Sequence, residues 1–242
     1  MRIVAIIQAR MGSTRLPGKV LMEIHGKPLL SYVVNRTRLC PALEDVVVAT
    51  SDQPADSPIA DFCRREGISV FRGELDDVLS RYRAAAMEHR ADAVVRITGD
   101  CPLIDPGIIG RVVSKFCEGG FDYVSNVLTR TYPRGLDAEV LSRDVIDRLH
   151  HNPQLTAEDR EHVVLYIRNH PQDFHLGSVI HTEDHSDLRW TVDTPADFVL
   201  IQKIYAHFHG NMSISWIDVL AAYAQHPEWR DINSDIPQKS RF

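Results

Sequence analysis

Cysteine is scarce in this 242-residue chain, and long hydrophobic runs are missing from it. The four cysteines are widely spaced and form no CxxC pair, so we expect free thiols in a reducing cytoplasm and not a zinc finger or a disulfide framework. No apolar run approaches the ~20 residues that a membrane-spanning helix needs, so we expect no insertion into a membrane. The N-terminus has one basic residue and no small-residue cleavage site, which predicts no secretory signal.

Positive charge is not in excess either. The formal net charge is −6 at pH 7, whereas a general nucleic-acid-binding protein normally presents a basic surface, so we expect no nucleic-acid partner. Hydrophobic residues make up 44% of the chain and charged residues 25%, values that are ordinary for a globular protein. No repeat, low-complexity segment or interdomain linker is evident, and we predict a single domain over residues 1–242.

Acidic residues are absent from the segment 8–19, although the chain as a whole is acidic. The apolar run 3–7 before it and the pattern 28–34 after it predict a buried strand, a basic loop and a helix that opens at Pro28. Backbone amides and cations are what a polyphosphate needs, and Gly12 and Gly18 let the backbone approach a ligand closely. The loop residues predicted to bind a nucleotide are Gln8, Ala9, Arg10, Gly12, Ser13, Arg15 and Lys19.

The loop matches neither of two common phosphate-binding motifs. A Walker A loop has four residues between its glycines and Ser or Thr after its lysine, whereas here five residues separate Gly12 from Gly18 and Val20 follows Lys19. A GxGxxG pattern is also missing. The alternative interpretation is a solvated turn with surface basic residues, and we expect the Lys19 side chain to be solvated.

Strand and helix alternate four times over the first hundred residues. Strands are predicted at 46–50, 68–71 and 93–97 after the first one, with helices between them. This alternation is the pattern of an α/β protein with a mostly parallel sheet and helices on both faces. Ligands of such sheets lie beyond the carboxyl ends of the strands, so the basic loop and Asp100, which follows the fourth strand, are expected at one crevice.

The second half of the chain is less regular. Strands are predicted at 121–125, 174–180 and 188–192. Thr156 and Asp159 form a capping-box pattern that predicts a helix extending to Ile167. Thr194, followed by Pro195, predicts the start of a helix that runs to about His207, and Ser213 or Ser215 opens a last helix. The tail from Pro227 is expected to be irregular.

Asp100 and Asp193 each follow a predicted strand, so both carboxylates are expected near the basic loop. Two carboxylates that face a phosphate-binding loop can hold Mg²⁺ through oxygen ligands. Such an ion would neutralise phosphate charge and orient an α-phosphate for in-line attack. The alternative for each residue is a turn or a helix cap, and a capping role fits Asp193 in particular, because Thr194 and Pro195 follow it.

The segment "IIQARMGSTRLPGKVL" resembles the SpsF-like (spore coat polysaccharide biosynthesis) cytidylyltransferase family, whose relatives are CMP-KDO synthetase and acylneuraminate cytidylyltransferase. "ITGDCPLIDP" and "TVDTPADF" resemble the family's metal-binding segments, which implies that Asp100 and Asp193 are metal ligands. The KDO branch has an acid directly after its Asp, where Cys101 stands here. This difference makes KDO itself a less suitable substrate.

The resemblance covers nearly the whole chain and implies the nucleotide-diphospho-sugar transferase (GT-A-like) fold. Residues 1–120 would form the nucleotide-binding half, and 121–242 the half that holds the acceptor sugar and the second metal ligand. The implied enzyme is cytoplasmic and transfers CMP from CTP to a sugar, in particular an acidic sugar such as a nonulosonic acid, with Mg²⁺ and release of pyrophosphate, for cell-surface polysaccharide biosynthesis. A homodimer is one option for its assembly.

Further residues receive roles from the same resemblance. Lys19, Arg15 and Arg10 would stabilise charge on the phosphates, and Gly73 and Asp77 would line the side of the nucleotide base. The positions assigned to the acceptor sugar are Arg134, Asp137, Glu139 and Arg160. For Arg160, the exposed first turn of a helix is the alternative interpretation.

Two other functions are compatible with the sequence. A glycosyltransferase of the same fold would use a finished nucleotide sugar and would want a DxD-type pair after the fourth strand, which Gly99-Asp100-Cys101 lacks. A non-catalytic nucleotide-binding protein of a glycan pathway would bind a triphosphate without turnover. Among the twelve histidines, His181 and His185 have i, i+4 spacing in a predicted loop, which favours a structural or surface role over a zinc site.

Overall fold

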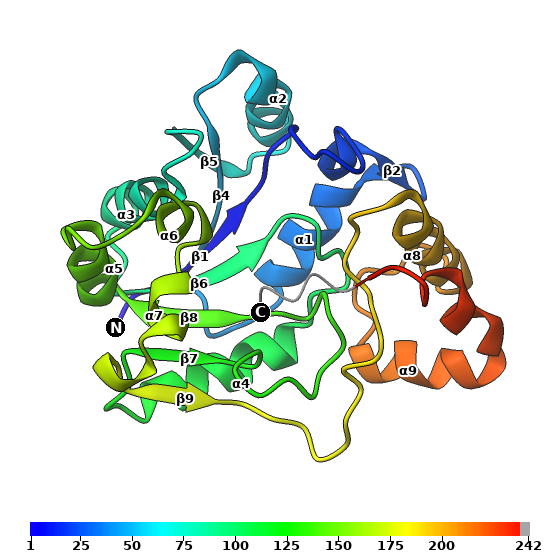
Figure 1. Ribbon diagram of the computed structural model, residues 1–242. Coiled ribbons are helices and arrows are strands. Elements are labelled where there is room, and N and C mark those ends of the chain that lie inside the picture. Colours follow the sequence, from blue (N-terminus) through cyan, green and yellow to red (C-terminus); the bar gives the residue numbers. More distant parts are fainter. Residues whose placement is uncertain (238–242) are drawn as a thin grey trace.

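A seven-stranded sheet runs through the centre of the computed structural model, which describes residues 1–237 (Figure 1). The strand order is β5-β4-β1-β6-β8-β7-β9. The strands are β1 (Ile3–Gln8), β4 (Asp45–Ser51), β5 (Ser69–Gly73), β6 (Ala93–Thr98), β7 (Tyr123–Ser125), β8 (Glu139–Ser142) and β9 (Leu176–Ser178). Strands from both halves of the chain therefore share one sheet.

The sheet is mostly parallel, as the alternation of strands and helices predicts. Strands β5, β4, β1 and β6 pair in parallel, β8 is antiparallel to both β6 and β7, and β9 is again parallel to β7. Apolar side chains cover both faces of β1, because Ile3, Ala5 and Ile7 pack into one hydrophobic cluster, while Val4 and Ile6 pack into another. Burial on both faces explains why this strand reads as a continuous apolar run.

Helices lie on both faces of the sheet (Figure 1). Helices α1, α2, α4, α8 and α9 contribute to the cluster that contains Ile7, whereas α3, α5 and the region of α6 and α7 contribute to the cluster that contains Ile6. The helices are α1 (Leu29–Arg38), α2 (Ser57–Arg65), α3 (Val78–Glu88), α4 (Pro106–Cys117), α5 (Arg143–His150), α6 (Ala157–His162), α7 (Leu165–Asn169), α8 (Pro195–His207) and α9 (Trp216–Gln225). Two short strands, β2 (Glu23–Ile24) and β3 (Lys27–Pro28), pair just before α1.

Polar side chains cap several helices at positions that the sequence marks. Thr156 and Thr194 each form a capping box with the residue three positions later, and Ser215 does the same for α9. Asp77 accepts a hydrogen bond from the Ser80 amide at the start of α3. Caps of this kind contribute about 1 kcal/mol each. Because Thr194 is the cap of α8, the capping interpretation of Asp193 is wrong.

The predicted helix 156–167 is in fact two helices. Helix α6 ends at His162, Val163 has a φ of 52°, and α7 begins at Leu165. Val163 and Val164 are both fully buried. The chain therefore changes direction at a buried position between the two helices.

The predicted strand 188–192 is an extended segment outside the ladders of the sheet. Arg134 and Arg189 form an isolated bridge, and the Val192 amide donates to the Asp100 carbonyl at 2.8 Å. The alternation of Leu188, Trp190 and Val192 correctly predicts burial, but the backbone partners are a loop and a turn.

Two further findings concern the helices. The tail from Pro227 contains a 3₁₀ helix, Pro227–Ile232, where the sequence predicts irregular structure. Over residues 1–237, none of the helices is both long and apolar enough to cross a membrane.

Candidate active site

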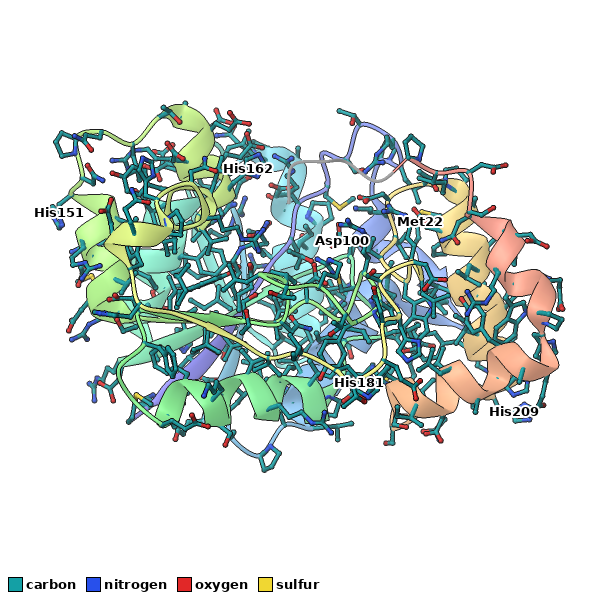
Figure 2. All side chains as sticks on the ribbon, turned by 60° about the horizontal axis from the view of Figure 1, so that its bottom comes forward. Met22, Asp100, His151, His162, His181 and His209 are labelled. Carbon is teal, nitrogen blue, oxygen red and sulfur yellow. The ribbon has the colours of Figure 1, made fainter. Side chains whose placement is uncertain are left out.

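The basic loop and the turn after β6 begin side by side. Gln8 and Thr98, the last residues of β1 and β6, are partners in the parallel ladder. The Gly99 amide donates to the Gln8 carbonyl at 2.8 Å, and a Cβ on Gly99 would lie 2.9 Å from that oxygen. A glycine is therefore needed for this close approach. It brings Asp100 to the base of the loop, near the middle of the molecule (Figure 2).

The loop is held in a defined shape by its own backbone and by one buried acid. The Met11 carbonyl accepts hydrogen bonds from the amides of Ser13 and Gly18, and Gly18 has a φ of 70°. Asp56, which is 2% exposed, accepts from the Met11 amide at 2.6 Å. Sequence reasoning misses this anchor, although an acid just before Ser57 and Pro58 is a signal for a structural role at a helix start.

Lys19 is buried, so the prediction of a solvated side chain is wrong. It is 7% exposed, and its ammonium donates to Asp100 at 2.7 Å, to Asp193 at 2.9 Å and to the Val192 carbonyl at 2.7 Å. Burial lowers the pKa of Lys19, but the two carboxylates outweigh it, and the pKa is raised. The lysine is a fixed cation that joins the loop to both predicted metal ligands.

Asp193 is held by cations on both carboxylate oxygens. One oxygen accepts from Lys19, and the other lies 2.7 Å from Arg189 and 2.9 Å from Arg15. Burial raises the pKa of Asp193, but the contacts with Lys19, Arg189 and Arg15 lower it to about 2. The structure thus brings Asp100 and Asp193 together, with the cations of the basic loop around them.

This donor set fits a divalent cation that also binds phosphate. The two carboxylates converge on one positive charge, and carboxylate oxygens are the ligands that Mg²⁺ prefers. No group of three or more His, Cys, Asp or Glu side chains that could hold a metal occurs within residues 1–237. Mg²⁺ typically takes one or two carboxylates and completes its shell with substrate phosphates and water. Asp100 and Asp193 are the residues that would hold such an ion.

A cavity of about 230 Å³ lies over the loop. We refer to it as the loop cavity. All seven loop residues predicted to bind a nucleotide line it: Gln8, Ala9, Arg10, Gly12, Ser13, Arg15 and Lys19. It also contains Arg81 from α3 and Glu161 and His162 from α6, which sequence reasoning misses.

A second cavity of about 190 Å³ adjoins the first, and we refer to it as the arginine cavity. Five arginines line it: Arg15, Arg96, Arg134, Arg168 and Arg189. The two cavities share four residues, Arg15, Thr98, Asp100 and Asp193. The two carboxylates therefore stand where the cavities meet.

Glu139 lies in the arginine cavity but is engaged within the protein. It is 1% exposed and forms ion pairs with Arg96 and Arg168, while the Tyr123 hydroxyl donates to it at 2.6 Å. Burial raises the pKa of Glu139, but Arg96 and Arg168 outweigh this effect and lower it to about 2. Glu139 thus holds two arginines at the cavity wall. Sequence reasoning assigns neither of them to the site.

Arg134 is the cation of this cavity that forms no ion pair within residues 1–237, although Asp137 is near enough to attract it. Its Nε atom is buried without a hydrogen-bond partner there. Burial and the neighbouring Arg130 lower its pKa. Asp137, also predicted for the acceptor, forms a two-pronged pair with Arg130 at 2.7 and 2.8 Å. Arg134 is therefore available to an anionic ligand.

Three predicted site residues line neither cavity. Gly73 is the last residue of β5. Asp77 caps α3 and pairs with Arg160 at 2.8 Å. Arg160 also donates to the His150 carbonyl at 3.1 Å. The side chain that α6 directs toward the loop is the next one, Glu161, which lies 3.4 Å from Arg10.

The comparison with protein families decides the identity. The sequence model of the cytidylyltransferase family matches residues 4–220. The chain belongs to the cytidylyltransferase family. Spore coat polysaccharide biosynthesis protein SpsF of Bacillus subtilis is 32% identical over 232 residues, which cover 93% of this chain and 95% of that protein. A protein of Methanocaldococcus jannaschii is 34% identical over 242 residues, covering 99% and 98%. The resemblance drawn from the loop is thereby confirmed.

Solved structures of cytidylyltransferases have the same fold. A cytidylyltransferase from Leptospira borgpetersenii superposes with a TM-score of 0.90 at 31% identity, covering 99% of both chains. CMP:2-keto-3-deoxy-manno-octonic acid synthetase complexed with CTP superposes with a TM-score of 0.65 at 21% identity, covering 86% of this chain and 99% of that one. The latter likeness shows a common fold. The expected nucleotidyltransferase fold, a mostly parallel sheet flanked by helices, is confirmed.

Proposed function

We propose that the protein transfers CMP from CTP to an acidic sugar and releases pyrophosphate. The observation that carries this proposal is the place of Asp100 and Asp193 at the junction of the two cavities. A nucleotidyl transfer needs the α-phosphate of one substrate and a hydroxyl group of the other at a shared point. A basic cavity on each side of a carboxylate pair supplies that arrangement.

The loop cavity is the proposed site of CTP. Arg10, Arg15 and Lys19 are the cations there, and charge-assisted contacts from such groups stabilise phosphate oxygens in the ground state and the transition state. Among residues 1–237, and apart from its own chain neighbours, Gly12 has no atom within 4 Å of the place where a Cβ would stand. A phosphate can therefore approach the backbone at this point.

The arginine cavity is the proposed site of the acceptor sugar. Arg134 provides a guanidinium whose buried Nε has no hydrogen-bond partner within residues 1–237, and a carboxylate matches its planar geometry with two parallel hydrogen bonds. We keep Arg134, and not Arg160, as the group that binds the sugar acid, because Arg160 pairs with Asp77. The Glu139 carboxylate holds Arg96 and Arg168 in the wall of the same cavity.

The proposed reaction is an in-line displacement at the α-phosphorus. The oxygen of the sugar hydroxyl forms a bond to phosphorus and gives up its proton to water, while the bond to the bridging oxygen breaks and pyrophosphate leaves with the electron pair. Mg²⁺, when bound by Asp100 and Asp193, would neutralise phosphate charge during this step. Lys19 and Arg15, which contact these carboxylates, are placed to bind phosphate oxygens once a nucleotide enters.

This proposal assigns different tasks to the two halves of the chain. Residues 1–120 supply the basic loop and Asp100, and 121–242 supply Arg134 and Asp193. By analogy with the spore coat protein of Bacillus subtilis, we propose a role in the biosynthesis of a cell-surface polysaccharide. Since CTP is a cytoplasmic metabolite, we assign the reaction to the cytoplasm.

The test is pyrophosphate release from each of the four ribonucleoside triphosphates, with a panel of sugar acids and with the same sugars after reduction of the carboxyl group. We expect release with CTP and a sugar acid, and a much smaller rate with the reduced sugar. Equal rates for both forms would contradict the acidic acceptor. Tight binding of CTP without release under any condition would contradict the enzyme and favour a nucleotide-binding protein of a glycan pathway.

A further inference from the structure

Asn233 lies beyond residue 220, where the match to the family ends, yet its side chain reaches back to the site. It is 7% exposed. We propose that Asn233 is a positioning residue that sets the orientation of the Asp193 carboxylate by way of Asp197 and Arg189. This inference rests on the proposed role of Asp193 as a metal ligand.

The first step is the contact that Asn233 makes. Its side-chain amide donates to Asp197 at 2.8 Å and to the Arg189 carbonyl at 3.0 Å. One NH₂ group thereby joins the beginning of the extended segment to the first turn of α8. Asp193 lies between these two points in the chain, so the amide fixes both ends of the short stretch that carries the ligand.

The second step is the role of Asp197, which is fully buried. One of its oxygens accepts from Arg189 at 2.9 Å and from Asn233, and the other accepts from the backbone amides of Asp193 and Thr194 at 3.0 and 2.9 Å. The same carboxylate therefore completes the capping box that Thr194 begins and fixes the backbone of the ligand. Losing the Asn233 contact leaves this buried acid with one donor fewer.

The third step connects this arrangement to the ligand atoms. The Arg189 guanidinium lies 2.7 Å from one oxygen of Asp193, and the other oxygen faces Lys19 at the junction of the cavities. Arg189, together with Arg15 on the same oxygen, thus holds the Asp193 carboxylate with its other oxygen toward Lys19. Partners behind a metal ligand orient it, and their loss typically weakens metal binding by about 10- to 100-fold.

The neighbouring Trp229 provides a matched control. It is 3% exposed, stacks on the His226 ring with a centroid separation of 4.4 Å and meets Tyr223 at 5.5 Å. Trp229 docks the same tail by packing and makes no hydrogen bond to Asp197 or Arg189. A Trp229→Phe variant loosens the tail without removing the amide.

The experiment measures Mn²⁺ binding from the signal of free Mn²⁺ in electron paramagnetic resonance, with CTP present and the acceptor absent so that no turnover occurs. We expect Asn233→Ala to raise the Mn²⁺ dissociation constant about tenfold and to leave the affinity for metal-free CTP within about twofold. Asn233→Ser keeps one hydroxyl donor, and it should show an intermediate shift. Trp229→Phe should lower the melting temperature and leave Mn²⁺ binding unchanged.

The Asp193→Asn variant distinguishes failure of the metal site from failure of the positioning role of Asn233. If Asp193→Asn leaves Mn²⁺ binding unchanged, the metal site itself is overturned. If Asp193→Asn weakens Mn²⁺ binding but both Asn233 variants bind as the wild type does, only the positioning role is overturned. Equal weakening by Trp229→Phe and Asn233→Ala would also overturn it, because a loosened tail would then explain both.

Discussion

The ammonium of Lys19 lies 2.7 Å from a carboxylate oxygen of Asp100. This contact joins the basic loop to the turn after β6 and takes the lysine almost completely out of solvent. A desolvated cation is tolerated because two acids surround it, and removing it would leave Asp100 without its ion-pair partner, whereas Asp193 would keep Arg15 and Arg189. Lys19 therefore serves the stability of the protein as well as its proposed chemistry.

The first prediction concerns Lys19→Ala. We expect turnover to be largely lost and the free energy of unfolding to fall by about 1–3 kcal/mol, which is less than for a fully buried pair because the two carboxylates keep some contact with solvent. Mg²⁺ should then raise the melting temperature of the variant more than that of the wild type, because it can replace the ammonium. Thermal denaturation with and without Mg²⁺ checks this, with the exposed Lys203→Ala as the control. Wild-type melting and wild-type turnover in Lys19→Ala would contradict both roles.

The second prediction uses the open space beside Gly12. Beyond its chain neighbours, no atom of the described part of the chain lies within 4 Å of the place of its missing Cβ, so Gly12→Ala should melt like the wild type. An added methyl group in a packed contact costs about 1–3 kcal/mol, so the affinity for CTP should fall by about five- to 150-fold if the nucleotide packs against this backbone. Calorimetric titration with CTP measures the effect, and Gly110→Ala in α4 is the control. Unchanged CTP affinity would mean that the nucleotide does not touch Gly12.

The third prediction compares two arginines. Arg134→Ala should raise the KM for a sugar acid by about ten- to a hundredfold, because a charge-assisted contact contributes about 1.5–3 kcal/mol. The KM for CTP should stay within about twofold. Arg160→Ala removes a partly exposed pair with Asp77 and should cost at most about 1 kcal/mol of stability, with little change in either KM. Steady-state kinetics of both variants measure these KM values. A larger rise of the KM for the sugar acid in Arg160→Ala than in Arg134→Ala would place the acceptor site at Arg160.

The fourth prediction is a pH dependence of stability at Glu139. Its pKa is lowered from 4.5 to about 2, so its contribution is complete above pH 4.5 and is lost as the pH falls through about 2. Glu139→Gln leaves Arg96 and Arg168 without their common anion and should lower the free energy of unfolding by about 3–5 kcal/mol at pH 7. Urea unfolding at several pH values should show this difference shrinking below pH 4.5. A difference that stays constant or grows on acidification would refute the assignment.

Much of the fold can be predicted from the sequence, because a central strand is a continuous run of apolar residues. Strands β1, β4 and β6 bury side chains on both faces, so an apolar run marks each of them to within a residue or so. The segment 188–192 shows the limit of this reasoning. The alternation of apolar residues in this segment shows that their side chains are buried. It does not show whether the backbone pairs with a strand of the sheet or, as here, with Arg134 and the turn at Asp100.

The site follows from the sequence where its residues share one segment or each follow a predicted strand, as Asp100 and Asp193 do. The loop residues reach one cavity because one segment carries them. The burial of Lys19 depends on Asp193, far away in the sequence, so the loop alone predicts a solvated lysine. The sequence does contain a signal for Arg96, because an arginine inside an apolar strand needs an acidic or polar partner. That partner, Glu139, lies opposite it across a strand pairing that no sequence pattern reveals.

The central claim is that Asp100 and Asp193 together hold the divalent ion of the reaction. The most direct measurement is a Mg²⁺ titration of pyrophosphate release at saturating CTP for the wild type, Asp100→Asn and Asp193→Asn. Asp187→Asn, which removes an exposed partner of Arg230, is the control. We predict that both site variants need much more Mg²⁺ for half-maximal turnover, while the control follows the wild type. Unchanged Mg²⁺ dependence in both site variants would contradict the claim, and a shift in Asp100→Asn alone would remove Asp193 from the metal site.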